Sequence, residues 1–325
     1  MTDRDWTVWA LPLGAALDAA LGDPRGWPHP VRGIGWLIAM TERSARFCLV
    51  RTGNHPRAER FAGVALAVTV VGLTSLAVWG AVAIGDRLGG ILALLFRSLL
   101  IYWGLAARSL GDEALRASGT TDLVAARREL AMIVGRDTAE LGRSEIDRAC
   151  VETVAENTSD GIVAPLFWLA LLGPVGLWAY KAISTLDSMV GYRNERYLRL
   201  GWASARLDDL ACLVPARLTW LLIALASILV CERPWAALRI GWRDGRKHPS
   251  PNAAWGEAAM AGALGVQLGG VASYGGVVSN KPRLGDSIQP IEPTTVRRAV
   301  RLMQATAVLA IALAWAVRLG LTSAA

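Results

Sequence analysis

Residues 61–85 read FAGVALAVTVVGLTSLAVWGAVAIG and contain no charged residue. A helix needs about 20 predominantly apolar residues to cross a bilayer, so this stretch is long enough to span one. Hydrophobic residues make up 53% of the 325 residues, and the mean hydropathy is +0.36, which is high for an ordinary soluble domain of this size. The sequence therefore predicts an integral membrane protein.

Further apolar stretches lie on both sides of residues 61–85, and the longer ones are interrupted only by one or two arginines. We expect transmembrane or membrane-inserted segments at residues 6–21, 61–85, 88–110, 162–180, 210–231 and 300–320. No internal repeat or linker is visible, so we expect one membrane-embedded domain over residues 1–325. The predicted fold class is all-α: a polytopic helical bundle in the membrane, with amphipathic helices and loops that face the cytoplasm.

The basic residues indicate orientation rather than nucleic-acid binding. The net charge is +7, but the arginines are spread through residues 25–60, 108–148 and 233–301, between the apolar segments. Such residues favour a cytoplasmic location for these three regions. The topology of residues 162–231 stays open, because two crossings there would place the basic residues of 181–208 outside. Gly173-Pro174 could instead split 162–180 into a re-entrant hairpin.

Two amphipathic helices are predicted within the polar region that follows residue 111. The first covers Thr121–Met132, with Thr121 or Asp122 as N-cap, and stops at Gly135. The second runs from about Ser144 to Glu156.

The second helix carries an acidic face. Glu145, Glu152 and Glu156 are seven and four residues apart, which puts their carboxylates on one side together with Arg148. We expect the helix to end at Asn157–Ser159 and Asp160 to cap the next one. Two interpretations of this cluster are open on spacing alone: a Mg²⁺ site completed by substrate phosphates, or a solvated face paired with arginine.

A second group of polar residues, Lys181–Tyr197, begins where an apolar segment ends. Lys181 is a candidate phosphate contact, although a lysine at a helix end commonly extends to the interface instead. Asp187 also lies at this boundary, and Gly191 permits a close turn. The acidic pair Asp208-Asp209 is expected to cap the helix that follows it.

The third group is Arg243–Asn252, which leads into an expected small-residue helix, Ala253–Gly270. Within that helix the pairs Ala258/Gly262 and Gly265/Gly269 would let neighbouring helices approach closely. Glu257 is an isolated carboxylate among apolar residues. Lys247-His248, before a helix N-terminus, could bind an anion, while an ordinary hydrogen-bonded role for His248 is the alternative.

Motifs in this order resemble the CobD/CbiB family, known as adenosylcobinamide-phosphate synthases of cobalamin biosynthesis. The residues that carry the resemblance are Leu17-Asp18, Gly22-Asp23-Pro24-Arg25, His29-Pro30-Val31-Arg32, Glu152–Pro165, Lys181–Tyr197, Gly201-Trp202, Arg206-Leu207-Asp208-Asp209, Pro215–Thr219, Asp244-Gly245, His248-Pro249-Ser250-Pro251-Asn252, Glu257, Gly262–Gly269, Lys281-Pro282 and Leu284-Gly285-Asp286. They span nearly the whole chain. One departure is Ser184, where the family usually has Asn.

The resemblance implies an ATP-dependent ligase that forms an amide between adenosylcobyric acid and (R)-1-amino-2-propanol or its O-phosphate. The corrinoid is then a substrate, ATP and Mg²⁺ are the expected cofactors, and association with other late cobalamin-assembly membrane enzymes is a family expectation. The implied location is the cytoplasmic membrane, with the active site facing the cytoplasm. No Gly-x-x-x-x-Gly-Lys-Ser/Thr loop is present, so any nucleotide site is non-standard.

Candidate roles follow from this resemblance together with the shared helix face. The predicted metal ligands are Glu152, Glu156 and Asp160, and the wider catalytic set adds Asp187, His248 and Glu257, with His248 or Glu257 as general base. The predicted substrate or phosphate contacts are Asn157, Lys181, Arg193, Lys247 and Asn252. Two alternatives remain: an AmpE-like membrane protein without enzymatic activity, and a transporter that uses buried carboxylates for ion coupling.

Overall fold

The computed structural model describes residues 3–24, 26, 29–51 and 55–323. Arg25, Trp27 and Pro28, which belong to or adjoin the first family motifs, lie outside the described residues. The described chain is predominantly helical, as predicted. Its elements are α1 (Asp3–Leu21), α2 (Pro30–Arg51), α3 (Pro56–Leu88), α4 (Gly90–Tyr102), α5 (Ala107–Gly119), α6 (Leu123–Ala131), α7 (Arg143–Asn157), η1 (Thr158–Val163), α8 (Ala164–Val190), α9 (Trp202–Ala211), α10 (Leu213–Leu229), α11 (Pro234–Asp244), α12 (Ala253–Leu264), β1 (Leu268–Tyr274), β2 (Val277–Leu284) and α13 (Pro293–Ser323).

The chain forms two compact units, where the sequence predicts one domain. Unit 1 contains residues 1–105, 164–212 and 314–325, and unit 2 contains residues 106–163 and 213–313. The segments alternate along the chain, so neither unit is continuous in sequence.

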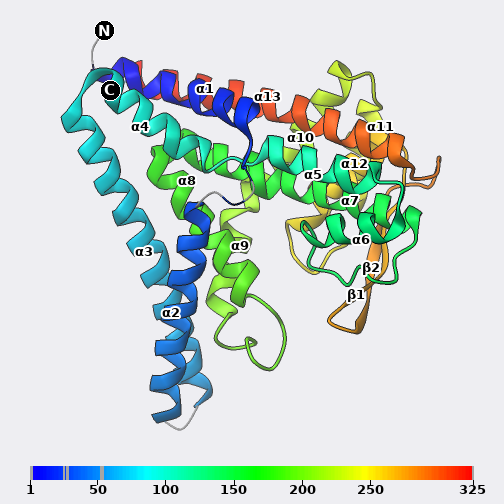
Figure 1. The fold of residues 1–325 in the computed structure, drawn as a ribbon, viewed down its shortest axis with the longest axis horizontal. Helices are drawn as coiled ribbons and strands as arrows, with labels where there is room; N and C mark the ends of the chain where they lie inside the picture. The colour runs from blue at the N-terminus through cyan, green and yellow to red at the C-terminus, as the bar shows by residue number, and fades with distance from the viewer. Residues whose placement is uncertain (1–2, 25, 27–28, 52–54, 324–325) are drawn as a thin grey trace. The chain divides into compact units, whose positions relative to one another are not determined.

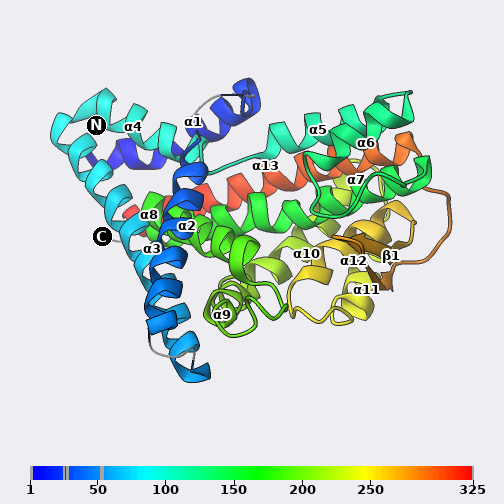
Figure 2. The ribbon, with the colours of Figure 1, turned by 60° about the horizontal axis from the view of Figure 1, so that its bottom comes forward.

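Unit 1 is built from long apolar helices. Helix α1 packs against α4, and α3 packs against both α2 and α8. Helices α2 and α3 run side by side over much of their length in both views (Figures 1 and 2). The rings of Trp9 and Trp315 are 5.4 Å apart and join the first helix of this unit to its last segment.

Unit 2 is a helical bundle with one β-hairpin. Helix α12 packs against α10, α11 and α7. A Cβ at Gly262 would collide with the backbone carbonyl of Ala236 on α11, so this glycine allows the two helices to approach closely, as predicted. Strands β1 and β2 pair antiparallel (Figure 1). Asp137 holds their turn, since its carboxylate accepts hydrogen bonds from the backbone N–H groups of Gly275 (3.0 Å) and Gly276 (2.8 Å).

Several helices have the length and composition of membrane spans. In the described part of the chain, four continuous helical stretches qualify: Pro56–Leu88, Gly90–Gly119, Arg143–Val190 and Pro293–Ser323. A fifth candidate is the pair Trp202–Ala211 and Leu213–Leu229, which is bent by 44°. The protein is therefore a multi-pass membrane protein. Gly173 interrupts α8 with a non-helical conformation (φ 67°, ψ −161°), at the break that Gly173-Pro174 predicts.

The helix break expected at Asn157–Asp160 is absent. Helix α7 passes through the π-helix η1 directly into α8. The reason is local hydrogen bonding: the Asn157 amide donates to the Thr153 carbonyl (3.0 Å), and the Thr158 hydroxyl donates to the Val154 carbonyl (2.6 Å). These side chains bond to the preceding helical turn instead of capping its end. Asp160 therefore lies within a continuous helix, and the prediction that it caps a new helix is wrong.

The helix expected over Ala253–Gly270 is also shorter than predicted. It ends at Leu264, because Gly265 adopts the left-handed conformation (φ 70°, ψ 35°) that commonly terminates helices. Gly269 lies instead in β1, where the strand register shifts. The prediction that Gly265 and Gly269 form a helix-packing pair is therefore wrong.

Candidate active site

The centre of the candidate site in unit 2 is a buried ion pair. Arg136, in the loop after α6, donates from Nη2 to Oε2 of Glu152 on α7, and their side chains are only 8% and 5% exposed. The other oxygen of Glu152 accepts from the backbone N–H of Gly269 at 2.8 Å. Arg148 contributes a second positive charge, with its Nε 3.8 Å from Oε1 of Glu152. Glu152 thus connects α7 to the loop after α6 and to the β-hairpin.

A second carboxyl group, Glu257, is buried beside this pair. It projects from α12, in which the other residues are alanine, glycine, tryptophan, methionine and leucine. Burial raises the pKa of Glu257 to about 8; the negative charges of Glu156 and Glu152 contribute to the increase, and Lys281 and Arg136 oppose it. Glu257 is therefore largely protonated at neutral pH and becomes a carboxylate near pH 8.

Lys281 supplies the nearby positive charge. This β2 residue places its Nζ 5.5 Å from the ring centroid of Tyr274 on β1. Burial alone would lower the pKa of Lys281, but a hydrogen bond to Tyr274 and the charges of Glu257 and Glu156 raise it overall. Lys281 therefore stays charged beside a carboxyl group that titrates near neutrality. Perturbed groups in such an arrangement are typical of sites that transfer protons.

The predicted acidic cluster is only partly reproduced. The negative charges of Glu156 and Glu152 both act on Glu257 and help to raise its pKa. Glu156 is solvent-exposed on α7, and Glu145 instead accepts from the Gly142 backbone N–H at 2.8 Å. Within the residues that the structure describes, no three His, Cys, Asp or Glu side chains are grouped to hold a metal ion. The assignment of Glu152, Glu156 and Asp160 as Mg²⁺ ligands stays a prediction.

The loop between α11 and α12 is stabilised by its own side chains. Nδ1 of His248 accepts from the Ser250 backbone N–H (3.0 Å), so only Nε2 of this ring could act on a substrate. Lys247 Nζ lies 2.6 Å from an oxygen of the buried Asp244. Asn252 accepts from Arg217 (2.5 Å). The loop is therefore held by charged side chains, and the functional roles predicted for His248, Lys247 and Asn252 stay predictions.

The remaining predicted residues lie in unit 1. Asp187 lies near the end of α8 and contacts Gly191. A Cβ at Gly191 would collide with the Asp187 carboxylate, and the Gly191 backbone N–H donates to the Asp187 carbonyl (2.8 Å). Gly191 thus follows the last residue of α8, and the close turn predicted there stays a prediction. Arg193 lines a cavity of about 260 Å³ with Tyr192, Tyr197, Arg206, Asp209 and neighbouring residues. Lys181 lines a different cavity of about 290 Å³.

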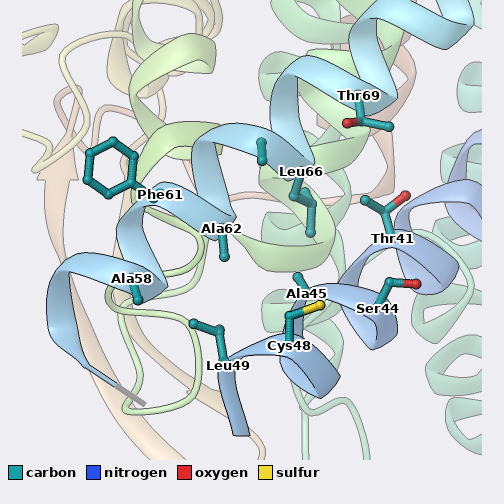
Figure 3. A pocket seen from close by; sticks show the side chains of 11 residues that line it. Thr41, Ser44, Ala45, Cys48, Leu49, Ala58, Phe61, Ala62, Leu66 and Thr69 are labelled. Carbon is teal, nitrogen blue, oxygen red and sulfur yellow. The ribbon is translucent and has the colours of Figure 1, made fainter. Parts of the chain in front are cut away.

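An apolar groove of about 560 Å³ lies between α2 and α3 of unit 1. Cys48 and Leu49 on α2 point towards Ala62 and Leu66 on α3 (Figure 3). The hydroxyl groups of Thr41 and Ser44 that line it donate to carbonyls of their own helix. This groove offers no charged group to a ligand, so it does not suit the chemistry of a carboxylate, an amine or a phosphate.

Comparison with known proteins supports one family over nearly the whole chain. A sequence model of the family described as "CobD/Cbib protein" matches residues 11–303. The chain is 47% identical to "Cobalamin biosynthesis protein CobD" of Klebsiella pneumoniae subsp. pneumoniae, over 98% of this chain and 100% of that protein. It is 50% identical to "Cobalamin biosynthesis protein CobD" of Pelobacter propionicus, over 94% and 93% of the two chains.

The chain belongs to the CobD/CbiB family. The resemblance inferred from its motifs is thereby confirmed. It is also 46% identical to "Cobalamin biosynthesis protein CbiB" of Salmonella typhimurium, over 98% of this chain and 100% of that protein. No solved structure matches this CobD/CbiB chain.

Sequence reasoning missed three parts of the charged centre in this CobD/CbiB protein. Arg136 follows the glycine that was expected to end a helix, and nothing in its spacing links it to Glu152. Lys281 belongs to a recognised motif, but its partner Tyr274 became visible only through the pairing of β1 with β2. The contact between Gly269 and Glu152 uses a backbone group, which leaves no residue-specific signal.

Proposed function

We propose that this protein is a cobalamin-biosynthesis enzyme of the cytoplasmic membrane that joins adenosylcobyric acid to (R)-1-amino-2-propanol or its O-phosphate. The product is adenosylcobinamide or its phosphate, and ATP drives the reaction. Membership of the CobD/CbiB family and the names of the relatives, which are cobalamin biosynthesis proteins, support the pathway. The observation that carries the enzymatic part is Glu257, a buried carboxyl group whose pKa is about 8. We propose that its site faces the cytoplasm, where ATP is present.

The reaction needs two changes in bonding. A carboxylate is a poor electrophile, so we propose that an oxygen of the corrinoid carboxylate attacks the γ-phosphorus of ATP and releases ADP. The amine nitrogen then attacks the carbon of this acyl phosphate, forms the C–N bond and expels inorganic phosphate. The nitrogen must lose a proton during this step, which requires a general base.

Glu257 has the properties of that base. General bases act most effectively when their pKa lies close to the working pH, and a pKa of about 8 is far better suited to an amine than that of an ordinary glutamate. Lys281 and Arg136 would stabilise the carboxylate form once it appears. Their positive charges lower the pKa of Glu257 and oppose the effect of burial.

Mg²⁺ would enter this site together with ATP phosphates. Mg²⁺ in such sites uses one or two carboxylates plus phosphate oxygens. The two oxygens of Glu152 already accept from Arg136 and the Gly269 backbone. The exposed Glu156 is therefore the better carboxylate for the metal, which would neutralise charge on the transferred phosphoryl group. A Glu156→Gln variant should then need a higher Mg²⁺ concentration for half-maximal rate; an unchanged requirement would contradict this role.

The test is a mass-spectrometric assay with protein purified in detergent. Adenosylcobyric acid, ATP and Mg²⁺ are supplied with each form of the amine in turn. We expect a corrinoid with the mass of the amide product, and the preferred amine form follows from the rates. Glu257→Gln should reduce the rate by about 10²–10⁴-fold, because a general base contributes that much. Glu145→Gln, an exposed carboxylate on α7, is the matched control and should remain close to wild type.

Two outcomes would overturn the proposal. Wild-type protein that forms no amide with either amine is not this enzyme. A Glu257→Gln variant with nearly the wild-type rate would remove the assigned base. Movement of a corrinoid into sealed vesicles without a change in its mass would favour the transporter alternative.

A further inference from the structure

Asp137 binds the tip of the β1–β2 hairpin in unit 2 through four hydrogen bonds. Its carboxylate accepts from the Ser273 hydroxyl (2.6 Å) and from the backbone N–H groups of Gly275 (3.0 Å) and Gly276 (2.8 Å). Its own backbone N–H donates to the Ser273 carbonyl (2.9 Å). The loop after α6 therefore holds the hairpin with both side chain and main chain, and no step of the proposed reaction uses Asp137.

The tip of the hairpin depends on this contact for its position. The half of β2 next to the turn, Val277–Asn280, is exposed at every residue, so apolar burial contributes little there. A two-stranded hairpin is only marginally stable by itself in water. The base of the hairpin is held separately, where the Gly269 backbone N–H donates to Glu152 at 2.8 Å. Asp137 thus holds the end of the hairpin that lies away from this base contact.

The hydrogen bonds of Asp137 lie on both sides of Tyr274. Ser273 and Gly275 are the neighbours of Tyr274 in the chain, so its backbone is fixed at each end. The strand register places the side chains of Tyr274 and Lys281 on the same face of the hairpin. These two side chains are hydrogen-bonded, and Nζ of Lys281 lies 5.5 Å from the centroid of the Tyr274 ring. Displacement of the tip would therefore remove a contact that orients Lys281.

Lys281 is the charge that the hairpin supplies to Glu257. Apart from burial, the groups that act most strongly on this carboxyl group are Glu156 and Glu152 on α7, Lys281 on β2 and Arg136 in the loop after α6. Lys281 and Arg136 favour the carboxylate, whereas the two glutamates oppose it. Of these four groups only Lys281 belongs to the hairpin, so movement of the hairpin would withdraw its charge while the others stay in place.

We propose that Asp137 is a positioning residue that holds the β1–β2 hairpin against the Glu257 centre, so that Tyr274 and Lys281 stay beside the assigned base. Its effect on the rate rests on the proposed function, but the restraint on the hairpin rests on the hydrogen bonds alone. Release of the tip moves Lys281 away and leaves Glu257 closer to like charges than to opposite ones. Asp137 acts through the hairpin and touches no substrate in this assignment.

Distances between two spin labels test the restraint without any substrate. The full-length protein in detergent is labelled at Val124→Cys on α6 and Val278→Cys on β2, which are both exposed positions. The exposed Cys48 and Cys231 are replaced beforehand. We expect one narrow distance distribution in the parent protein. Asp137→Ala should broaden it and add a population at longer distance, because the tip of the hairpin is released.

Three further variants show whether the carboxylate of Asp137 is the cause. Glu140→Gln removes an exposed carboxylate of the same loop and is the matched control, which should keep the narrow distribution. Asp137→Glu retains a carboxylate acceptor and should restore most of the narrow population. Lys281→Met removes the charge beside Glu257 but leaves the hydrogen bonds of Asp137 intact, so it should also keep the narrow distribution.

The corrinoid assay connects the restraint to the reaction. Lys281→Met should lower the rate at neutral pH about 10-fold, because loss of an opposite charge raises the pKa of a carboxyl group by about one unit or more. Asp137→Ala should lower the rate about threefold or more, and Asp137→Glu should recover part of that loss. In the Lys281→Met background, Asp137→Ala should cost less than about twofold more, because Asp137 acts through Lys281. A purely structural role would lower the rate by the same factor in both backgrounds.

The outcomes for the hairpin and for the reaction can be told apart. An unchanged distance distribution in Asp137→Ala, or a broad distribution in the parent protein itself, would overturn the proposal. An equal loss of rate with and without Lys281 would also overturn it. If the wild-type protein forms no amide, the proposed reaction fails, and the distance distributions still decide whether Asp137 holds the hairpin.

Discussion

Arg136→Met should destabilise unit 2 more than the loss of an ordinary surface charge. Removing one partner of a buried ion pair costs about 3–5 kcal/mol, because the other charge stays buried without compensation. Arg136 and Glu152 are 8% and 5% exposed, which places them in this class. The Gly269 backbone N–H and Arg148 still approach Glu152, at 2.8 Å and 3.8 Å. We therefore expect the lower end of the range, about 3 kcal/mol.

A thiol-labelling experiment measures this change in unit 2 alone. Cys150 lies on α7 and is fully buried, so a reagent reaches it only when unit 2 opens. In a protein whose other three cysteines are replaced, labelling in the regime of fast reclosing follows the population of the open form. About 3 kcal/mol then corresponds to labelling about 100-fold faster, or somewhat more.

The matching variants decide whether the ion pair is the cause. Arg128→Met removes an exposed arginine of α6 and should change the free energy of opening by less than about 0.5 kcal/mol. Glu152→Gln should be destabilising as well, and the double variant Arg136→Met/Glu152→Gln should cost clearly less than the sum of the two. Labelling of Arg136→Met within about threefold of the parent protein would refute the reasoning.

Three further predictions concern charge and backbone conformation in unit 2. The reaction rate should rise with pH around pH 8, where Glu257 loses its proton. Glu156→Gln should move the midpoint of this rise to lower pH, because the negative charge of Glu156 helps to raise the pKa of Glu257. An unshifted midpoint would contradict the electrostatic coupling between the two residues. Hydrogen bonds from Ser273 and the Gly276 and Gly275 backbone lower the pKa of Asp137 below its usual 3.8, so its stabilisation of the hairpin is complete above that pH and is lost as pH falls through the lower folded value. Asp137→Asn should accordingly speed amide hydrogen exchange at Gly275 and Gly276 at neutral pH, and unchanged exchange would exclude this role. Gly265→Ala should destabilise unit 2 by about 1–2 kcal/mol, because alanine disfavours the left-handed conformation and its Cβ would collide with the Arg233 side chain. If Cys150 were labelled at the parent rate, the backbone would have adapted to the substitution.

Much of the helical architecture could be predicted from the sequence because it depends on local patterns. Apolar runs of sufficient length indicate membrane helices wherever they occur, as at residues 61–85 within α3. Capping is equally local: Asp122 accepts from the Ala125 backbone N–H at 2.8 Å and begins α6, as one of the two predicted N-caps. Gly173-Pro174 marks a real interruption of α8 for the same reason.

The failures have two causes: local side-chain hydrogen bonds that composition does not reveal, and contacts between segments that are distant in the sequence. Asn157 and Ser159 favour a helix end by composition, but Asn157 and Thr158 bond back to the preceding turn. The small residues after Gly265 are compatible with a tightly packed helix as well as with a strand, and the pairing of β1 with β2 decides for the strand. Pairing of distant segments also created the centre around Glu257. The sequence itself shows that Glu257 is an isolated carboxyl group in an apolar helix. The fold alone brings Arg136 and Lys281 close to it.

The alternating order of segments in the two units has a consequence for biosynthesis. The chain passes between the units four times, and the last twelve residues, 314–325, belong to unit 1 together with the first 105. The ring contact of Trp9 therefore cannot form until Trp315, more than 300 residues later in the sequence, has been synthesised. Neither unit can be completed while the ribosome is still elongating the chain through α13. Assembly of both units must accordingly finish after α13 has been made, and neither unit can be isolated by cutting the chain once.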